Sequence, residues 1–176
     1  DDMKLISFSD SLILYSKNDS LKSVTDILAQ SSLIMLYAIF MGIPIKGAIA
    51  YGLQTADFNH NLHFGIPIID AHQLQDELLL YGVVVHNTFE QYLVQKDTLN
   101  TFIKSKIIFN FSAPMKSGDI DHYILNWPMF VKDREGIFSK LAELRRKTSG
   151  HPRKYIDNTL KFIEKAPVAN LNTFLA

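Results

Sequence analysis

The side chains that could do chemistry in this sequence include three carboxylates and a lysine beside or within apolar runs. Asp10 lies in the polar tripeptide 9–11 between two β-type runs, and Lys46 begins a run of small apolar residues. Asp70 and Asp76 lie in a segment with helical periodicity. Carboxylates can hold hard divalent cations, and a lysine can meet a phosphate. Each also has a structural interpretation, because a turn aspartate bonds its own backbone and helix or strand charges can face solvent.

Histidines raise the separate question of a zinc site. His60 and His63 have the spacing His-x-x-His, and His72 follows them. Zinc in proteins takes three or four His, Cys or carboxylate ligands, and we expect no acidic or thiol partner beside this pair. The pattern therefore does not favour zinc. The chain has no cysteine, which excludes disulfides and thiolate metal sites.

The elements that must position these side chains follow from hydrophobic periodicity. Residues 4–8 and 12–15 are short β-type runs around a tight polar connection, which predicts a hairpin. Residues 21–41 repeat apolar side chains at helical spacing after an Asn-Asp-Ser cap. The other expected elements are a strand over 43–51, a loop over 53–64, a helix from about 65 to 79, a strand over 83–85, a helical turn over 88–94, paired strands over 106–111 and 120–126, and helices over 132–147 and 152–164.

This order of elements predicts a single α+β domain. Residues 1–130 would form the α+β part, and residues 131–176 a helical extension of the same domain. A β-α unit before the hairpin would complete a βαββαβ, ferredoxin-like arrangement. Because the sequence begins inside what already looks like a strand, we expect that this first β-α unit is missing from it.

Composition and charge limit the classes of partner. The 18 basic and 18 acidic residues cancel, so there is no electrostatic footprint for nucleic acid and no basic face for an anionic membrane. The most apolar stretch, residues 31–45, is too short to span a bilayer and contains Gly42 and Pro44. No signal peptide is visible, and these observations together predict a soluble, cytoplasmic protein without a membrane segment.

Three segments, taken together, resemble the catalytic domain of class III nucleotidyl cyclases. They are the hairpin with Ser-Asp at its turn (residues 8–11), the small-residue strand that ends in glycine (45–52), and the aromatic-Gly opening of the next helix (64–71). They occur in the family's order and cover about residues 5–85. The divergent bacterial branch, which includes pyrimidine cyclases of anti-phage systems, is the most similar. The resemblance implies a ferredoxin-like cyclase core followed by an extra C-terminal hairpin and helices.

The resemblance also implies a reaction and a site. In the family, the ribose 3′-oxygen of a nucleoside triphosphate attacks the α-phosphorus and expels pyrophosphate, with two Mg²⁺ or Mn²⁺ ions at a homodimer interface. Asp10 would be one metal-binding carboxylate, and the second would lie on the missing strand. The substrate-binding positions that the resemblance implies are Ser9, Ser11, Lys46, Gly47, Gly65 and Asp70.

Other positions depart from the family pattern and keep alternatives open. Ile69 and Gln73 stand where the family carries an Asn and an Arg, and the apolar Ile6 and Leu62 correspond to its base-selecting positions. Three hypotheses follow. The chain is a divergent cyclase, a catalytically inactive cyclase-fold module that binds nucleotide or dimerises, or a plain α+β domain. Turnover of a triphosphate separates the first from the other two.

Overall fold

The computed structural model describes residues 3–57, 60, 62–131 and 133–168, and it confirms the α+β class. The elements in chain order are β1 (Met3–Phe8), β2 (Ser11–Ser16), α1 (Leu21–Phe40), β3 (Gly47–Ile49), β4 (Thr55–Asp57), β5 (Leu62–Phe64), α2 (Ile66–Glu77), β6 (Val83–Val85), α3 (Asn87–Gln95), α4 (Leu99–Lys104), β7 (Ile108–Met115), β8 (Gly118–Leu125), a 3₁₀ turn (Trp127–Phe130), α5 (Glu135–Lys147) and α6 (Pro152–Lys165).

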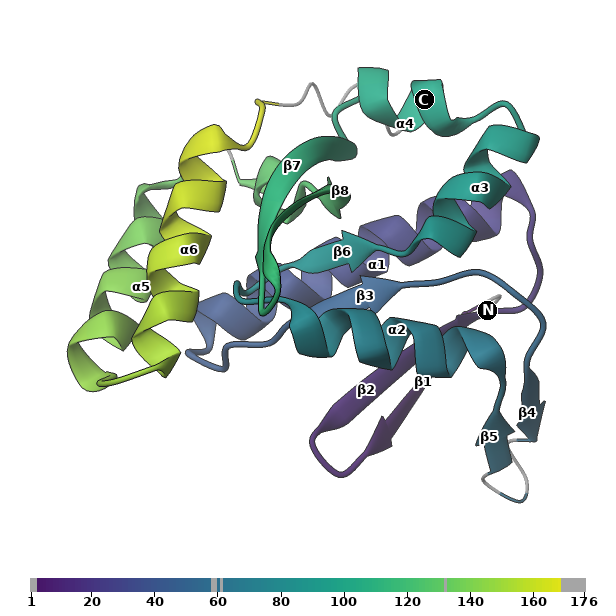
Figure 1. The fold of residues 1–176 in the computed structure, drawn as a ribbon, viewed down its shortest axis with the longest axis horizontal. Helices are drawn as coiled ribbons and strands as arrows, with labels where there is room; N and C mark the ends of the chain where they lie inside the picture. The colour runs from purple at the N-terminus through teal and green to yellow at the C-terminus, as the bar shows by residue number, and fades with distance from the viewer. Residues whose placement is uncertain (1–2, 58–59, 61, 132, 169–176) are drawn as a thin grey trace.

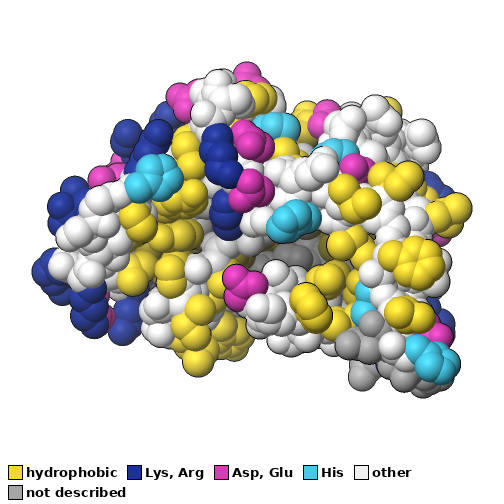
Figure 2. All heavy atoms as spheres, turned by 60° about the horizontal axis from the view of Figure 1, so that its bottom comes forward, with side chains coloured by type: hydrophobic (Ala, Val, Ile, Leu, Met, Phe, Trp, Pro, Cys, Tyr) yellow, Lys and Arg dark blue, Asp and Glu magenta, His cyan; other side chains and the backbone are white. Residues whose placement is uncertain are grey.

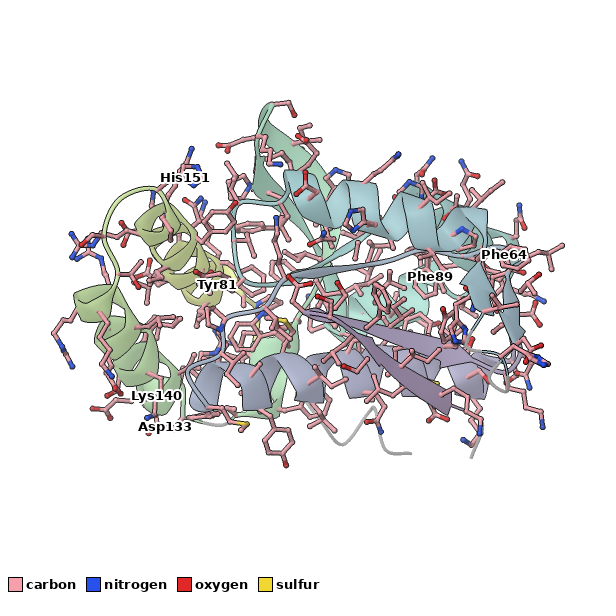
Figure 3. All side chains as sticks on the ribbon, turned by 90° about the horizontal axis from the view of Figure 1, so that it is seen from below. Phe64, Tyr81, Phe89, Asp133, Lys140 and His151 are labelled. Carbon is pink, nitrogen blue, oxygen red and sulfur yellow. The ribbon has the colours of Figure 1, made fainter. Side chains whose placement is uncertain are left out.

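A four-stranded mixed sheet with the order β3-β6-β8-β7 forms the centre of the fold. β3 is parallel to β6, with Gly47 opposite Val83 and Ile49 opposite Val85, whereas β8 is antiparallel to both β6 and β7. Helices α1 and α2 lie on opposite sides of β3 and β6 (Figures 1 and 3). The hairpin β1–β2 and the ribbon β4–β5 are separate two-stranded sheets, so the hairpin is not paired with β3.

Helix α1 forms where its periodicity predicts it. The Ser20 side chain accepts a hydrogen bond from the backbone N–H of Ser23 (3.2 Å) at its start, and Gly42 at φ 73° follows its end. By length and composition alone it is the one described helix apolar enough to cross a membrane. Its buried stripe, which includes Leu28 and Met35, packs into the core, which is consistent with a helix of a soluble protein.

Several predicted boundaries were wrong for identifiable reasons. The strand expected over 43–51 is only Gly47–Ile49, because Pro44 has no N–H to donate and the N–H of Tyr51 bonds the Thr88 side chain (3.1 Å) instead of a strand. The loop expected over 53–64 contains the antiparallel ribbon β4–β5. Helix α4 was not predicted, and β7 and β8 are longer than expected.

The C-terminal helices belong to the same core as the sheet. Trp127 and Phe162 are fully buried, and the Phe162 ring stacks on Phe109 and meets Phe111 edge-on, with ring centroids 5.7 and 5.4 Å away. Aromatic packing of this kind holds α6 against β7. Residues after 131 therefore share the hydrophobic core with residues before 130.

Partly buried hydrogen bonds also fix α6 in place. The Thr159 hydroxyl oxygen accepts from the backbone N–H of Tyr81 (2.8 Å), in the segment that follows α2. The Arg134 guanidinium donates to the carbonyl oxygens of Ile163 (2.7 Å) and Ala166 (2.8 Å) at the end of α6. A cation at this position complements the negative end of the helix dipole.

Candidate functional site

The predicted metal ligand lies at the tip of the hairpin β1–β2. Phe8 pairs with Ser11, so Ser9 and Asp10 form a two-residue turn, and Ser9 has φ 56°, as primed hairpin turns require. Ser9, Asp10 and Ser11 are all exposed. The turn lies at the end of the hairpin that points away from the four-stranded sheet (Figure 1). This geometry offers one carboxylate and two hydroxyls to solvent.

Among the described residues, no group of three or more His, Asp or Glu side chains is arranged to hold a metal ion. At the hairpin turn the carboxylate of Asp10 is the one charged metal ligand. This donor set fits a single Mg²⁺ that takes its remaining ligands from water and phosphate oxygens. It does not by itself fit two ions, which would need a second carboxylate.

Lys46 is engaged at the end of α2. Its ammonium donates to the carbonyl oxygens of Asp76 (3.0 Å) and Leu78 (3.2 Å), and it lies 5.5 Å from the centre of the Tyr155 ring. Burial lowers the pKa of Lys46. Asp76 in turn forms an ion pair with Lys116 (2.6 Å). The structure therefore gives Lys46 a helix-capping role, and its place at a phosphate stays a prediction.

Gly47 and Gly65 have separate structural explanations. The N–H of Gly47 donates to the carbonyl oxygen of Gly82 (2.8 Å), so this amide is used in the sheet. A Cβ on Gly65 would lie 2.8 Å from the Cβ and 2.9 Å from the Cα of Gln54, which is too close for any side chain. Gly65 thus allows the start of α2 to pass against the segment before β4.

Gly65→Ala is expected to lower the free energy of unfolding by about 1–3 kcal/mol, because the added Cβ meets the Gln54 backbone, which cannot rotate away. Gly47→Ala is the matched control, since its Cβ would meet Val83 at an ordinary 3.7 Å. Urea unfolding of both variants measures the difference. Equal stability of the two variants would contradict this account of Gly65.

Asp70 lies beside a histidine that sequence reasoning did not single out. Its Oδ2 is 3.9 Å from Nδ1 of His86, and both side chains are about one-fifth exposed. Nδ1 of His86 also lies 2.9 Å from the Thr88 hydroxyl and accepts from the Thr88 N–H (3.3 Å). This arrangement leaves the proton of neutral His86 on Nε2.

These residues gather at the carboxyl ends of the two parallel strands. His86 directly follows β6, and the N–H of Tyr51, just after β3, donates to the Thr88 hydroxyl (3.1 Å). Open α/β sheets commonly place ligands at this edge. The sequence signal that could have identified His86 was the pattern His-x-Thr directly after three valines. In this pattern His86 is the N-cap residue of α3.

His122 on β8 faces the same region. Burial lowers its pKa, Glu90 partly opposes this effect, and His86 adds to it. The folded state therefore binds this proton less tightly than the unfolded state. The contribution of neutral His122 to the free energy of unfolding is fully present above the ordinary histidine pKa of about 6.5, and it is lost as the pH falls below that value. Urea unfolding between pH 8 and pH 5 should show this loss, and His122→Gln should reduce it.

His72→Gln is the control for the His122 variant, because the His72 side chain is exposed on α2. It should leave the pH dependence of unfolding unchanged. A slope that is the same in wild type and His122→Gln would contradict the assignment to His122.

The histidines weighed for zinc have other partners. Contrary to expectation, His60 has an acidic neighbour, Asp57. The ring Nδ1 of His60 lies 2.8 Å from Oδ2 of Asp57, and the backbone N–H of His60 donates to Oδ1 of Asp57 (3.1 Å). This pair closes the exposed end of the ribbon β4–β5. The His63 ring lies 5.7 Å from the Tyr15 ring and so connects the ribbon to β2.

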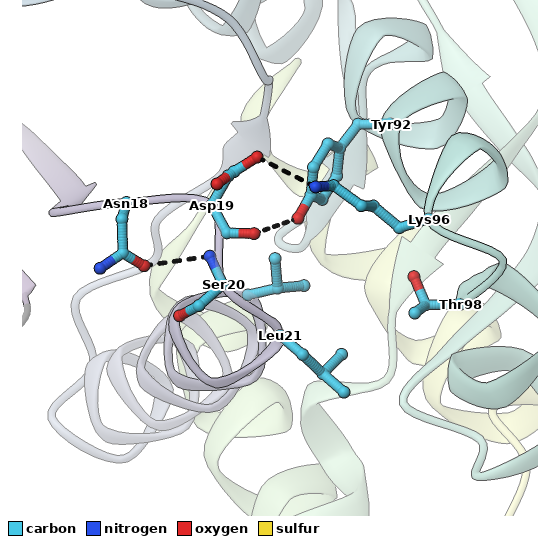
Figure 4. Close-up of a pocket in the computed structure, with 8 residues that line it drawn as sticks. Asn18, Asp19, Ser20, Leu21, Tyr92, Lys96 and Thr98 are labelled. Carbon is cyan, nitrogen blue, oxygen red and sulfur yellow. Dashed lines mark hydrogen bonds and ion pairs between the residues drawn. The ribbon is translucent and has the colours of Figure 1, made fainter.

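A hollow of about 410 Å³ lies at the start of α1, between Asp19 and Lys96 (Figure 4). Its polar groups are bonded to one another. The Asp19 carboxylate lies 3.4 Å from the Lys96 ammonium, the Tyr92 hydroxyl donates to the Asp19 carbonyl, and the Asn18 side chain accepts from the N–H of Ser20 (3.0 Å). Neither Asp10 nor Lys46 lines this hollow.

Comparisons of the chain with protein-family models, with curated proteins and with solved structures found no match. A functional conclusion therefore depends on the sequence pattern and the geometry described above. The structure brings Asp70 to His86, and it places Ser9, Asp10 and Ser11 together in one turn.

Proposed function

We propose that this protein is a divergent nucleotidyl cyclase-like enzyme that forms a cyclic nucleotide and pyrophosphate from a nucleoside triphosphate. The observation that carries the proposal is the exposed Ser9-Asp10 hairpin turn. The succession of α1, β3, α2 and β6 after the hairpin, with the helices on opposite sides of the sheet, adds support. In this proposal the protein works in the cytoplasm as a homodimer.

The residues have defined tasks in this proposal. Asp10 would hold a Mg²⁺ or Mn²⁺ ion, with Ser9 and Ser11 beside it for water or phosphate oxygens. The bound ions would supply charge stabilisation at phosphorus and a lower proton affinity for the attacking hydroxyl. Asp70, held near His86, would orient a polar group of the substrate at the carboxyl edge of β3 and β6.

The ferredoxin-like arrangement belongs to the same proposal. Gly47 and Ile49 make the backbone bonds to β6, so the N–H and C=O of Ala48 point away from it. A further strand beside β3 could use these groups, and it would carry the second carboxylate.

The inactive nucleotide-binding or dimerisation module is the second candidate. Two observations favour it. The Lys46 ammonium already has two carbonyl acceptors, and the family's Asn and Arg positions carry Ile69 and Gln73, both exposed on α2. This candidate predicts nucleotide affinity or a dimer without turnover.

The test is incubation of the purified full-length protein, including any strand that precedes residue 1, with ATP, GTP, CTP and UTP in turn, with Mn²⁺, followed by chromatography of the products. A cyclic product from one nucleotide is the expected result. No product from any of them, with the protein folded, would overturn the cyclase proposal in favour of the binding module. A monomer without affinity for any nucleotide would overturn the binding module as well.

A further inference from the structure

Large apolar side chains are exposed together at one end of the molecule, over β4, β5 and the start of α2 (Figure 2). We call this surface the apolar end, and its residues are Leu53 (97% exposed), Leu62 (54%), Phe64 (61%), Ile66 (70%) and Ile69 (55%). Figure 3 shows Phe64 at the outer edge of the molecule, opposite the end that carries α5 and α6. Exposure of this extent marks an interaction surface in a soluble domain.

The residues of the apolar end form one continuous surface, because they lie on adjacent segments of the chain. Leu62 and Phe64 stand two residues apart on β5 and therefore share its outer face, while His63 points to the other face, toward Tyr15. Ile66 and Ile69 follow at a spacing of three on α2. Together with Gln54, Thr55 and Gly65, the residues Leu53, Phe64 and Ile66 line a hollow of about 270 Å³.

The chain segment that carries the apolar end has no basic side chain, which favours a protein partner over a lipid or nucleic-acid surface. The 49 residues from Gly47 to Gln95 contain no lysine and no arginine. Surfaces that bind anionic lipids or phosphates need such residues. The acidic Asp57 beside the apolar end already has a partner, because its Oδ2 lies 2.8 Å from Nδ1 of His60.

The size and shape of the apolar end fit a second copy of the same chain. From the exposed fractions, its five residues expose on the order of 700 Å², close to the roughly 800 Å² per partner of a standard interface. A two-fold interface must be complementary to itself. Leu53, almost completely exposed, stands beside the hollow that it helps to line, so each copy offers a protruding side chain and a recess.

We propose that two copies of this chain pair through their apolar ends across a two-fold axis, with Leu53 of each copy entering the hollow of the other. This inference deepens the homodimer of the proposed function by naming its surface. It is independent of catalysis, because its test measures mass and not turnover.

The test compares the mass of the full chain in solution by light scattering and analytical ultracentrifugation. Wild type should show twice the monomer mass of 20.0 kDa. Leu53→Asp and Ile66→Glu should weaken the dimer by about 100-fold or more, since each places an unpaired charge in the interface. Ile66→Glu is chosen because an acidic residue in the first turn of α2 suits the helix dipole, so the monomer keeps its fold.

Tyr37→Glu is the matched control, since Tyr37 is also an exposed apolar residue (65%) but lies on α1. It should leave the mass unchanged. A wild-type monomer at about 100 μM, or dimers that persist in both apolar-end variants, would overturn the proposal. A monomer that sediments with neutral phosphatidylcholine vesicles in a Leu53-dependent manner would overturn it in favour of a membrane. A dimer without turnover would contradict only the cyclase proposal.

Discussion

In the proposed cyclase, Asp10→Asn is expected to lower cyclic-nucleotide formation by at least about a hundredfold, because loss of even an indirect contact to a metal ligand already costs about 10–100-fold. The carboxylate at the hairpin turn is the one charged oxygen ligand that β1–β2 offers. Asparagine keeps the size of the side chain and suits turns equally well. The fold should therefore persist while the affinity for Mn²⁺ falls. The measurement is the initial rate of product formation across a Mn²⁺ titration.

Asp119→Asn is the matched control for this experiment. Asp119 is also exposed and lies next to a hairpin turn, but in β7–β8, where it pairs with Pro114. Its substitution should leave the rate unchanged. Equal loss in the two variants would point to a general effect of surface charge, and no loss in Asp10→Asn would remove Asp10 from the site.

Phe162→Ala is expected to lower the free energy of unfolding by about 3–5 kcal/mol, the usual cost of removing a buried aromatic ring. The side chain is fully buried and contacts three aromatic rings, those of Phe109, Phe111 and Trp127. A domain is stable by only about 5–15 kcal/mol, so the loss is a large part of the total. Urea unfolding followed by tryptophan fluorescence measures it, since Trp127 is the single tryptophan.

Lys161→Ala provides the comparison on the same helix, because Lys161 is exposed and its loss should change stability by less than about 0.5 kcal/mol. Phe162→Leu, which keeps part of the volume, should fall between the two and remains measurable if the alanine variant does not fold. A cost for Phe162→Ala similar to that of Lys161→Ala would mean that α6 is not part of the core.

The long helices could be predicted from the sequence because their signals are local. The apolar spacing of α1 and α6 covers several turns, and Ser20, Gly42 and Pro152 mark the ends. The ribbon β4–β5 could not be predicted, because its strands are three residues long and its position depends on distant contacts. Those contacts are the close approach of Gly65 to Gln54 and the ring contact between His63 and Tyr15.

The candidate site also has a part that the sequence predicts and a part that it does not. The turn that presents Asp10 depends on four neighbouring residues, so its pattern was readable in the sequence. The partners of Lys46 are carbonyls 30 and 32 residues away, and His86 lies across the sheet edge from Asp70. Single-sequence reasoning identifies residue types that suit a site, but such distant pairings depend on how α2 packs against β3 and β6.

The attachment of α6 to the segment after α2 has a consequence for synthesis on the ribosome. The Asn158 side chain donates to the carbonyl oxygen of Leu79 (2.8 Å) and Thr159 accepts from Tyr81, across separations of 79 and 78 residues. Chains emerge from the ribosome N-terminus first, and contacts between distant residues form slowly. The first 130 residues must therefore wait, with Phe109 and Phe111 uncovered, until Phe162 has been made. During that interval this uncovered aromatic surface is the part of the nascent chain most exposed to aggregation.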